Sequence, residues 1–342
     1  MLTLLPHQTD SLFQKKPPMP NILITSAGRR VSLVENFKKE LKEKYGSEAK
    51  VYTTDLEPDM STACRSSDGS FKLGKFIDSN YIAEMMAICK ENDVRLVIPT
   101  LDPELLLYAQ NRELFKKEGI ELLVSDFSLV KIFRDKRLTN QFFLENGFRL
   151  PALLDRQNLT FPLFIKPIDG SSSVNTFKIT NEGQLSPEML GNEKLLFMEY
   201  LSPQQYEEYT VDLYYTNNGD LKCVVPRLRI ATRSGEINKG ITRKNELIAF
   251  VTKNLLHMEG ARGCLTLQVF LNKENKSVYG IEVNPRFGGG YPLSYLAGAN
   301  YIKWIFEEYF ENKEVEPFDS WEENLLLLRY DAEMIVHEFD YR

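Results

Sequence analysis

QVFLNKENKSVYGIEVNPRFGGG, residues 268–290, is the stretch that decides the fold prediction. Apolar and polar residues alternate on both sides of the turn-rich run NKENKS, so the pattern predicts two antiparallel strands of a hairpin. Glu282 and Asn284 then share one face, and Gln268 joins them if the strands pair in that register. Three side-chain oxygens with no histidine or thiolate among them suit a hard cation such as Mg²⁺.

Arg286 follows the second strand of this hairpin. Its guanidinium can contact a phosphate oxygen through two N–H groups, and the three glycines behind it let the backbone approach a ligand closely. The alternative is a solvated hairpin with polar outer positions and a glycine turn. Spacing alone leaves both interpretations open.

The segment EVNPRFGGG, with a glutamine on the preceding strand, resembles the metal-binding end of the ATP-grasp fold, in the branch related to the large subunit of carbamoyl phosphate synthase. The resemblance implies that Gln268, Glu282 and Asn284 hold one or two Mg²⁺ (or Mn²⁺) ions against the phosphates of ATP. It also implies that Arg286 steadies the transferred phosphoryl group. Many ATP-grasp enzymes have a carboxylate where Gln268 stands, so weaker metal binding is expected here.

Composition limits the class of protein. A chain of 342 residues with 43% hydrophobic content can bury a sizeable core and is expected to form two or three domains. The net charge of -6 argues against a nucleic-acid or membrane binder. Four separated cysteines without a CxxC pair favour neither a zinc site nor disulfides, so a cytoplasmic protein is expected.

The first 20 residues contain four prolines and no clear periodicity, so they are expected to form a tail. Met19 directly precedes the first strand, and the sequence leaves open whether translation starts there or at Met1. From Asn21 onward, strand and helix signals alternate, which predicts a doubly wound parallel sheet with ligands at the carboxyl ends of its strands.

Two loops lie at such strand ends. SAGRR, residues 26–30, offers free amides and two arginines to an anion, but it fails the GxGxxG pattern. A dinucleotide site with Asp55 on the ribose is therefore a weak alternative. Asp102 is either a helix cap or a ligand contact. By resemblance, this region is the domain that precedes the ATP-grasp module and helps to bind the non-nucleotide substrate.

A lysine, Lys166, ends a short apolar strand and is followed by the stretch DGSSSV. A cation before a loop rich in backbone donors and hydroxyls can grip a phosphate chain, although an ordinary hairpin loop would look the same. The resemblance places Lys166 and Lys136, the lysine of a DK motif, on the nucleotide phosphates. It implies that four residues cover the β- and γ-phosphates: Gly170, Ser171, Ser172 and Ser173.

The apolar strand LLFMEYL leads, by resemblance, into a hinge whose backbone contacts adenine, at Glu199, Tyr200 and Leu201. The next strand, EYTVDLYY, places Glu208 and Asp212 on one face. Glu208 resembles the acid that binds the ribose hydroxyls. The alternative for both acids is a polar outer face.

A basic segment separates that strand from the metal hairpin. Six basic residues fall within 18 positions: Arg227, Arg229, Arg233, Lys239, Arg243 and Lys244. Alternation places Arg227 and Arg229 on one strand face, where they can grip a phosphate or carboxylate. The alternative is a solvated β-ribbon. Relatives line the meeting point of acceptor and phosphoryl donor with a similar segment, which implies that Arg227, Arg229 or Arg233 binds a substrate carboxylate or the γ-phosphate.

Motifs for covalent catalysis are missing from the sequence. There is no nucleophile elbow, catalytic cysteine motif or Walker A sequence, and no histidine lies in a triad-like motif; His257 is expected inside a helix over 246–259. Cations and a metal suit phosphoryl transfer. We therefore predict a ligase that uses ATP and Mg²⁺ to activate a small-molecule carboxylate as an acyl phosphate, which an amine then attacks.

Two other functions remain open at this point: a non-catalytic ATP-binding protein of the same fold, and an NAD-dependent oxidoreductase. A homodimer is a possible assembly. The predicted fold class is α/β, with α+β character in the C-terminal part: a doubly wound parallel sheet followed by a two-lobed ATP-grasp module. The predicted domains are a tail (1–20), a Rossmann-like domain (21–128), a small lobe with its linker helix (129–203) and a large lobe with the metal site (204–342).

Overall fold

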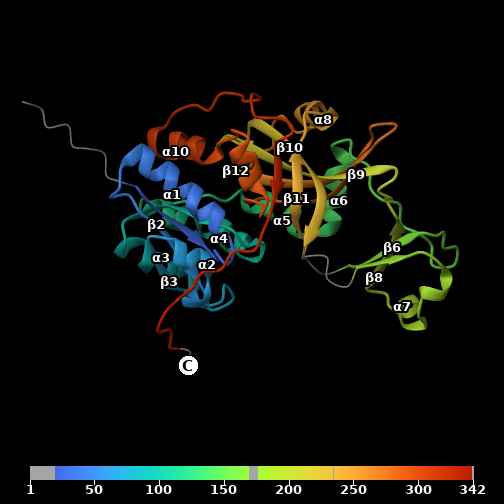
Figure 1. Ribbon diagram of the computed structural model, residues 1–342, viewed down its shortest axis with the longest axis horizontal. Helices are drawn as coiled ribbons and strands as arrows, with labels where there is room; N and C mark the ends of the chain where they lie inside the picture. Colours follow the sequence, from blue (N-terminus) through green and yellow to red (C-terminus); the bar gives the residue numbers. More distant parts are fainter. Residues whose placement is uncertain (1–19, 169–175, 234, 341–342) are drawn as a thin grey trace, which may run out of the picture.

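The computed structural model describes residues 20–168, 176–233 and 235–340. Three β-sheets follow one another along the long axis, from the N-terminal sheet at one end to the smallest sheet at the other (Figure 1). The predicted α/β fold class is confirmed, with a parallel sheet first and antiparallel sheets after it. None of the helices in the described ranges is both long and apolar enough to cross a membrane.

The N-terminal sheet is parallel and has the strand order β3-β2-β1-β4-β5. Its strands are β1 Asn21–Thr25, β2 Val51–Asp55, β3 Gly69–Lys72, β4 Val94–Pro99 and β5 Glu121–Leu122. The helices of this region are α1 Val31–Tyr45, η1 Pro58–Met60, α2 Thr62–Ser66, α3 Tyr81–Glu91 and α4 Asp102–Lys117. The order reverses between β1 and β4, so their carboxyl ends form the crevice where such sheets bind ligands.

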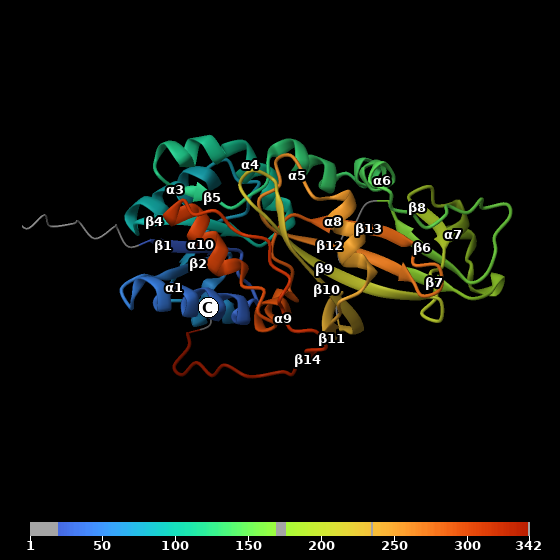
Figure 2. The same ribbon diagram turned by 90° about the horizontal axis from the view of Figure 1, so that it is seen from above.

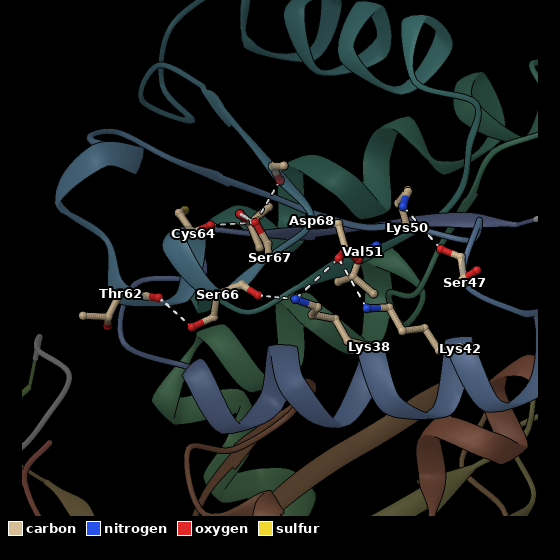
Figure 3. A network of polar contacts seen from close by, with 12 residues as sticks. Lys38, Lys42, Ser47, Lys50, Val51, Thr62, Cys64, Ser66, Ser67 and Asp68 are labelled. Atoms are coloured by element: carbon tan, nitrogen blue, oxygen red, sulfur yellow. Dashed lines mark hydrogen bonds and ion pairs between the residues drawn. The ribbon is translucent and has the colours of Figure 1, made fainter. Parts of the chain in front are cut away.

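Helix α1 packs on this sheet through four apolar residues at helical spacing: Leu33, Val34, Phe37 and Leu41. Its polar side is held by Asp68, just before β3 (Figure 3). The Asp68 carboxylate accepts a hydrogen bond from the backbone of Val51 at 2.9 Å and lies 3.4 Å from the ammonium of Lys38. This network ties α1 to the start of β2 and to the segment before β3.

A six-stranded sheet with the order β13-β12-β9-β10-β11-β14 forms the middle of the molecule. Its strands are β9 Tyr206–Tyr215, β10 Leu221–Arg233, β11 Glu236–Thr242, β12 Gly263–Asn272, β13 Val278–Asn284 and β14 Leu326–Leu328. Antiparallel pairing of β12 with β13 confirms the hairpin predicted from the sequence. A three-stranded sheet, β7-β6-β8, lies beyond it, with β6 Leu163–Pro167, β7 Phe177–Ile179 and β8 Leu195–Glu199.

The remaining helices are α5 Phe127–Arg134, α6 Lys136–Glu145, η2 Glu182–Gln184, α7 Pro187–Gly191, α8 Glu246–Asn254, α9 Tyr291–Leu296 and α10 Tyr301–Glu311. The prediction that His257 lies inside a helix was wrong, because α8 ends at Asn254. His257 instead hydrogen-bonds to Asp220 at 2.9 Å. Helix α10 is a core element rather than a free surface, since Tyr301, Ile302, Ile305 and Phe306 are buried.

One apolar core joins the N-terminal sheet to the six-stranded sheet. Phe37 of α1 meets Phe287, next to the predicted metal hairpin, at 5.6 Å between ring centroids, and Phe306 of α10 at 6.1 Å. Helices α9 and α10 contact α1, and α10 also contacts β12 of the six-stranded sheet (Figure 2). The three-stranded sheet has a separate small core of Leu163, Ile165, Ile179 and Phe197. The domain boundaries given above stay a proposal.

Candidate active site

The predicted metal ligands come together on the β12–β13 hairpin. Gln268 and Glu282 are direct partners across the two strands, so their side chains lie on the same face. Asn284, two residues beyond Glu282, donates from Nδ2 to Glu282 Oε1 at 3.1 Å. The register that the metal prediction required is therefore present.

The chemistry of these donors fits a hard cation. Gln268 donates from Nε2 to Glu208 Oε1 at 2.6 Å, so the atom engaged is the nitrogen and not the amide oxygen that can bind a metal. Magnesium is commonly held by one or two carboxylates together with substrate phosphates. No group of three or more His, Cys, Asp and Glu side chains forms a metal site among the described residues, so this mixed amide and carboxylate set depends on Glu282 for its charge.

Arg227 is buried beside the hairpin and forms a two-point ion pair. It is 1% exposed, and its Nε and Nη2 each donate to the carboxylate of Asp212 at 2.8 Å. Ser294 Oγ donates to the same carboxylate at 2.6 Å. The alternative that Arg227 lies on a solvated β-ribbon is therefore wrong, and so is the alternative that Asp212 lies on a polar outer face. Arg227 Nη1 is a buried donor without a partner in the described part of the protein.

Removing the partner of Arg227 should destabilise the fold. We expect Asp212→Ala to lower the free energy of unfolding by about 3 to 5 kcal/mol, because it leaves a buried guanidinium without a counter-charge. Urea unfolding measures this loss. The matched control is Asp331→Ala, which breaks the exposed ion pair with Arg233 and should not change stability measurably. Equal effects of the two substitutions would contradict the assignment.

Arg229 lies on the same face of β10 and also lines the site. Its Nε is 3.0 Å from Glu208 Oε1, and its other nitrogens donate to Thr210 Oγ1 at 3.2 Å and to the Gly235 carbonyl at 2.9 Å. It is only 10% exposed, so the solvated ribbon is wrong for this residue too. Arg233, by contrast, is 57% exposed and pairs with Asp331 outside the site.

These side chains line one cavity between the six-stranded sheet and the N-terminal sheet. Its walls include the three predicted metal ligands, Arg227, Arg229 and Arg286, and also Arg30 and Glu236. The three glycines that follow Phe287 form another wall. A Cβ on Gly288 would lie 2.8 Å from Thr266 Oγ1, and one on Gly290 would overlap Arg227 Nη1. Glycine here makes room for side chains of the site.

The N-terminal region contributes Arg30 to this cavity, and its Asp102 contacts Arg286 of the cavity. Asp102, the first residue of α4, forms an ion pair with Arg286 and makes no helix-cap hydrogen bond, so the helix-cap interpretation is wrong. Arg30 donates to the carbonyls of Phe287 at 3.0 Å and Thr100 at 3.2 Å. Burial lowers the pKa of Arg30 to about 10, and the positive charge of Arg286 acts in the same direction.

The loop before Arg30 is held by Asp55. The backbone N–H of Gly28 donates to Asp55 Oδ2 at 3.0 Å. The Asp55 carboxylate, which would bind ribose in a dinucleotide site, thus accepts a hydrogen bond from this loop instead. The arginines of SAGRR also differ in role, because Arg30 joins the two sheets while Arg29 is exposed.

Lys166 lies at the end of β6 in the three-stranded sheet, where its ammonium is affected by the charge of Glu282. Burial lowers the pKa of its ammonium, the charge of Lys136 lowers it further, and the carboxylate of Glu282 acts in the opposite direction. Lys136 Nζ donates to the carbonyl of Pro167 at 3.2 Å. Lys136 and Glu282 thus lie within electrostatic reach of Lys166.

Other predicted nucleotide contacts lie elsewhere or outside the described residues. Glu199 and Tyr200 line a separate hollow together with Ala152 and Ser202, and Leu201 is buried in a small aromatic cluster. The predicted phosphate-covering residues, Gly170, Ser171, Ser172 and Ser173, lie outside the described ranges. Glu208 contacts Gln268 and Arg229, so its predicted role with ribose stays a prediction.

The sequence analysis missed the cavity residue Glu236 and its ion-pair partner Arg329. Glu236 begins β11, and Arg329 follows β14; Arg329 Nη1 lies 2.8 Å from Glu236 Oε2. Glu236 is the sole acid between Arg227 and Lys244, which is a signal that the sequence does contain. Arg329 directly follows the apolar run LLLL, but only the pairing of β14 with β11 brings it to the site.

Comparison with known proteins finds two matching families. Residues 22–123 match the family described as "PylC-like, N-terminal domain", and residues 191–327 match "ATP-grasp in the biosynthetic pathway with Ter operon". A D-alanine–D-alanine ligase from Leptospira interrogans is 31% identical over 87 residues, which cover 21% of this chain and 25% of that protein. The chain thus spans about a quarter of the length of the curated relatives it matches.

Solved structures share the fold at low sequence identity. A biotin carboxylase from Campylobacter jejuni has a TM-score of 0.64 at 16% identity, covering 90% of this chain and 74% of that one. An L-amino acid ligase from Bacillus licheniformis has a TM-score of 0.60 at 15% identity, covering 86% and 74%. An ADP complex of N5-carboxyaminoimidazole synthetase from Staphylococcus aureus has a TM-score of 0.59 at 15% identity, covering 83% and 75%.

Residues 191–327 match an ATP-grasp family, and the chain shares the fold of the biotin carboxylase and of the N5-carboxyaminoimidazole synthetase. Its ATP-grasp region is preceded by a PylC-like N-terminal domain.

Proposed function

We propose that the protein is an ADP-forming ligase that uses ATP and Mg²⁺ to join a small-molecule carboxylate to an amine. The observation that carries this proposal is the convergence of Gln268, Glu282 and Asn284 on a cavity that also holds Arg286, with Lys166 within electrostatic reach of Glu282. The ligases among the relatives support it. Within the superfamily, we propose the branch related to carbamoyl phosphate synthase.

Each group has a role in the proposed reaction. Gln268, Glu282 and Asn284 would hold Mg²⁺, whose charge neutralises the phosphates of ATP. Lys166 and Lys136 hold the phosphate chain from the three-stranded sheet. Proposed nucleotide contacts at Glu199, Tyr200, Leu201 and Glu208, and at residues 170–173, complete that side.

Three arginines of the cavity bind or stabilise the phosphoryl group and the substrate carboxylate in this proposal. Arg286 and Arg229 bind the transferred phosphoryl group and the substrate carboxylate, and the unpartnered Nη1 of Arg227 adds a fixed positive charge. A carboxylate oxygen attacks the γ-phosphorus, and the bond to ADP breaks. The amine nitrogen then attacks the carbonyl carbon, the bond to phosphate breaks, and the phosphate leaves with the electron pair and a proton from nitrogen.

Hydroxylamine trapping tests this proposal. We expect the protein with ATP, Mg²⁺ and at least one acid from a panel of amino acids and small carboxylates to release ADP and convert the acyl phosphate into a hydroxamate. The assay measures ADP and hydroxamate in the same sample, with the acid omitted as control. Binding of ATP without hydroxamate from any acid would favour a non-catalytic ATP-binding protein, and binding of NADH but not ATP would favour an oxidoreductase.

We also propose that the protein is cytoplasmic and forms a homodimer. All four cysteines are free and buried, which supports a reducing cytoplasm. A homodimer is the proposed assembly, and sedimentation at several protein concentrations tests it.

A further inference from the structure

Glu236 lines the same cavity as the proposed metal ligands of the β12–β13 hairpin. It is one of two carboxylates, with Glu282, that line the cavity among the described residues. Its carboxylate packs over the backbone of Gly289, where a Cβ would lie 2.7 Å from Oε1. Since Glu282 is the proposed metal ligand, Glu236 is the acid left for the other substrate.

A cation of the protein itself already occupies the position beside Glu236. Arg329 Nη1 lies 2.8 Å from Glu236 Oε2, and Arg329 Nη2 donates to the carbonyl of Gly289. A carboxylate and a backbone carbonyl thus form a binding site for a positively charged donor, and a guanidinium fills it. The Glu236 and Arg329 side chains are 46% and 31% exposed, so a ligand can reach this site from solvent.

The position of Arg329 allows its guanidinium to move away from Glu236. It directly follows β14, the edge strand of the six-stranded sheet, and its backbone N–H donates to the carbonyl of Asn238 at 3.0 Å. Long side chains at partly exposed positions lose little when they exchange one partner for another. The guanidinium can therefore give way to a ligand without disturbance of the core.

Glu236 is kept ionised. Burial alone would raise the pKa of its carboxyl group, but the hydrogen bond and charge of Arg329, together with the charges of Arg30 and Arg29, lower it overall. An ionised carboxylate of low basicity binds an ammonium group and is a poor proton acceptor.

We propose that Glu236 and the Gly289 carbonyl bind the ammonium group of the amine substrate, which displaces the guanidinium of Arg329. This inference rests on the proposed ligase function. The bound ammonium gives one proton to solvent before the nitrogen attacks the acyl phosphate, and the second proton leaves with the phosphate. Glu236 is thus a binding residue for the cationic amine, separate from the residues that form the acyl phosphate.

Hydroxylamine separates the two substrate sites, because it is largely uncharged at neutral pH and does not need an ammonium site. The rates of amide and hydroxamate formation are measured in parallel, with the best acid of the panel and the best amino-acid nucleophile, or methylamine if no amino acid reacts. We expect Glu236→Gln to lower the amide-to-hydroxamate ratio at least tenfold and to raise the KM for the amine. Glu246→Gln, which removes a similarly exposed carboxylate paired with Lys276, is the matched control and should leave the ratio unchanged.

Arg329→Gln should act in the opposite direction. Without the competing guanidinium, the KM for the amine is expected to fall severalfold. A ratio in Glu236→Gln within twofold of wild type would overturn the proposal, and so would a rise of the amine KM in Arg329→Gln. Absence of hydroxamate from the wild-type protein would instead reject the ligase function itself, and the inference with it.

Discussion

Replacing Glu282 by alanine is expected to lower the rate of ADP release by about a thousandfold or more, which corresponds to roughly 4 kcal/mol of lost stabilisation of the transition state. The reason is charge. Gln268 and Asn284 are neutral amides, so Glu282 supplies the one negative charge of the proposed metal set. Glu282→Gln should be nearly as damaging, because it keeps the shape of the side chain but makes all three ligands amides.

ADP release over a range of Mg²⁺ concentrations measures this effect. The control is Glu274→Ala, which removes an exposed acid from the turn of the same hairpin and should behave like wild type. If Glu282→Ala kept activity within tenfold of wild type at every Mg²⁺ concentration, the metal site would have to be assigned elsewhere.

Replacing Arg286 by alanine is expected to lower kcat by about a thousandfold while the affinity for ATP changes little, because a positioned arginine stabilises charge that develops during phosphoryl transfer. Arg286 is oriented by its ion pair with Asp102 and by a hydrogen bond from Nη1 to the Phe287 carbonyl at 3.0 Å. Lysine cannot reproduce this planar arrangement, so Arg286→Lys should recover only a small part of the activity.

Single-turnover ADP formation and nucleotide titration separate the two effects of Arg286→Ala. The matched control is Arg233→Ala, which removes an exposed arginine of β10 from outside the cavity and should leave kcat unchanged. A loss of ATP affinity that accounts for the whole decrease in activity would assign Arg286 to nucleotide binding instead.

Local sequence patterns predicted the metal hairpin because all of its determinants lie within a few residues. Alternation defined the faces of β12 and β13, but the register was left as a condition of the prediction, and the structure meets it by pairing Gln268 with Glu282. The alternating parallel-sheet region was predicted for the same reason. Contacts between distant residues had no such local signal. Arg30 and Phe287 are 257 residues apart in the sequence, and Asp102 and Arg286 are 184 residues apart.

The interpretation of polar residues depended on burial, which the sequence does not contain. Alternation placed Arg227 and Asp212 on strand faces, but a solvated face and a buried ion pair share that pattern. Glu236 was passed over because its neighbours are basic, and its role emerges only when Gly289 and Arg329 are brought beside it.

The edge-on contact of Phe37 with Phe287 has a consequence for how such a protein can diversify. Phe287 directly follows Arg286, the proposed phosphoryl-transfer residue, and it also belongs to the aromatic seam in the core that joins the N-terminal sheet to the six-stranded sheet. If recombination replaced the N-terminal region by one from another protein, the new region would have to form the same aromatic contact with Phe287. Otherwise Arg286, the neighbouring residue, would be misplaced. We therefore expect changes of substrate specificity to arise by single substitutions around the cavity, while the N-terminal region and the rest of the chain are inherited together.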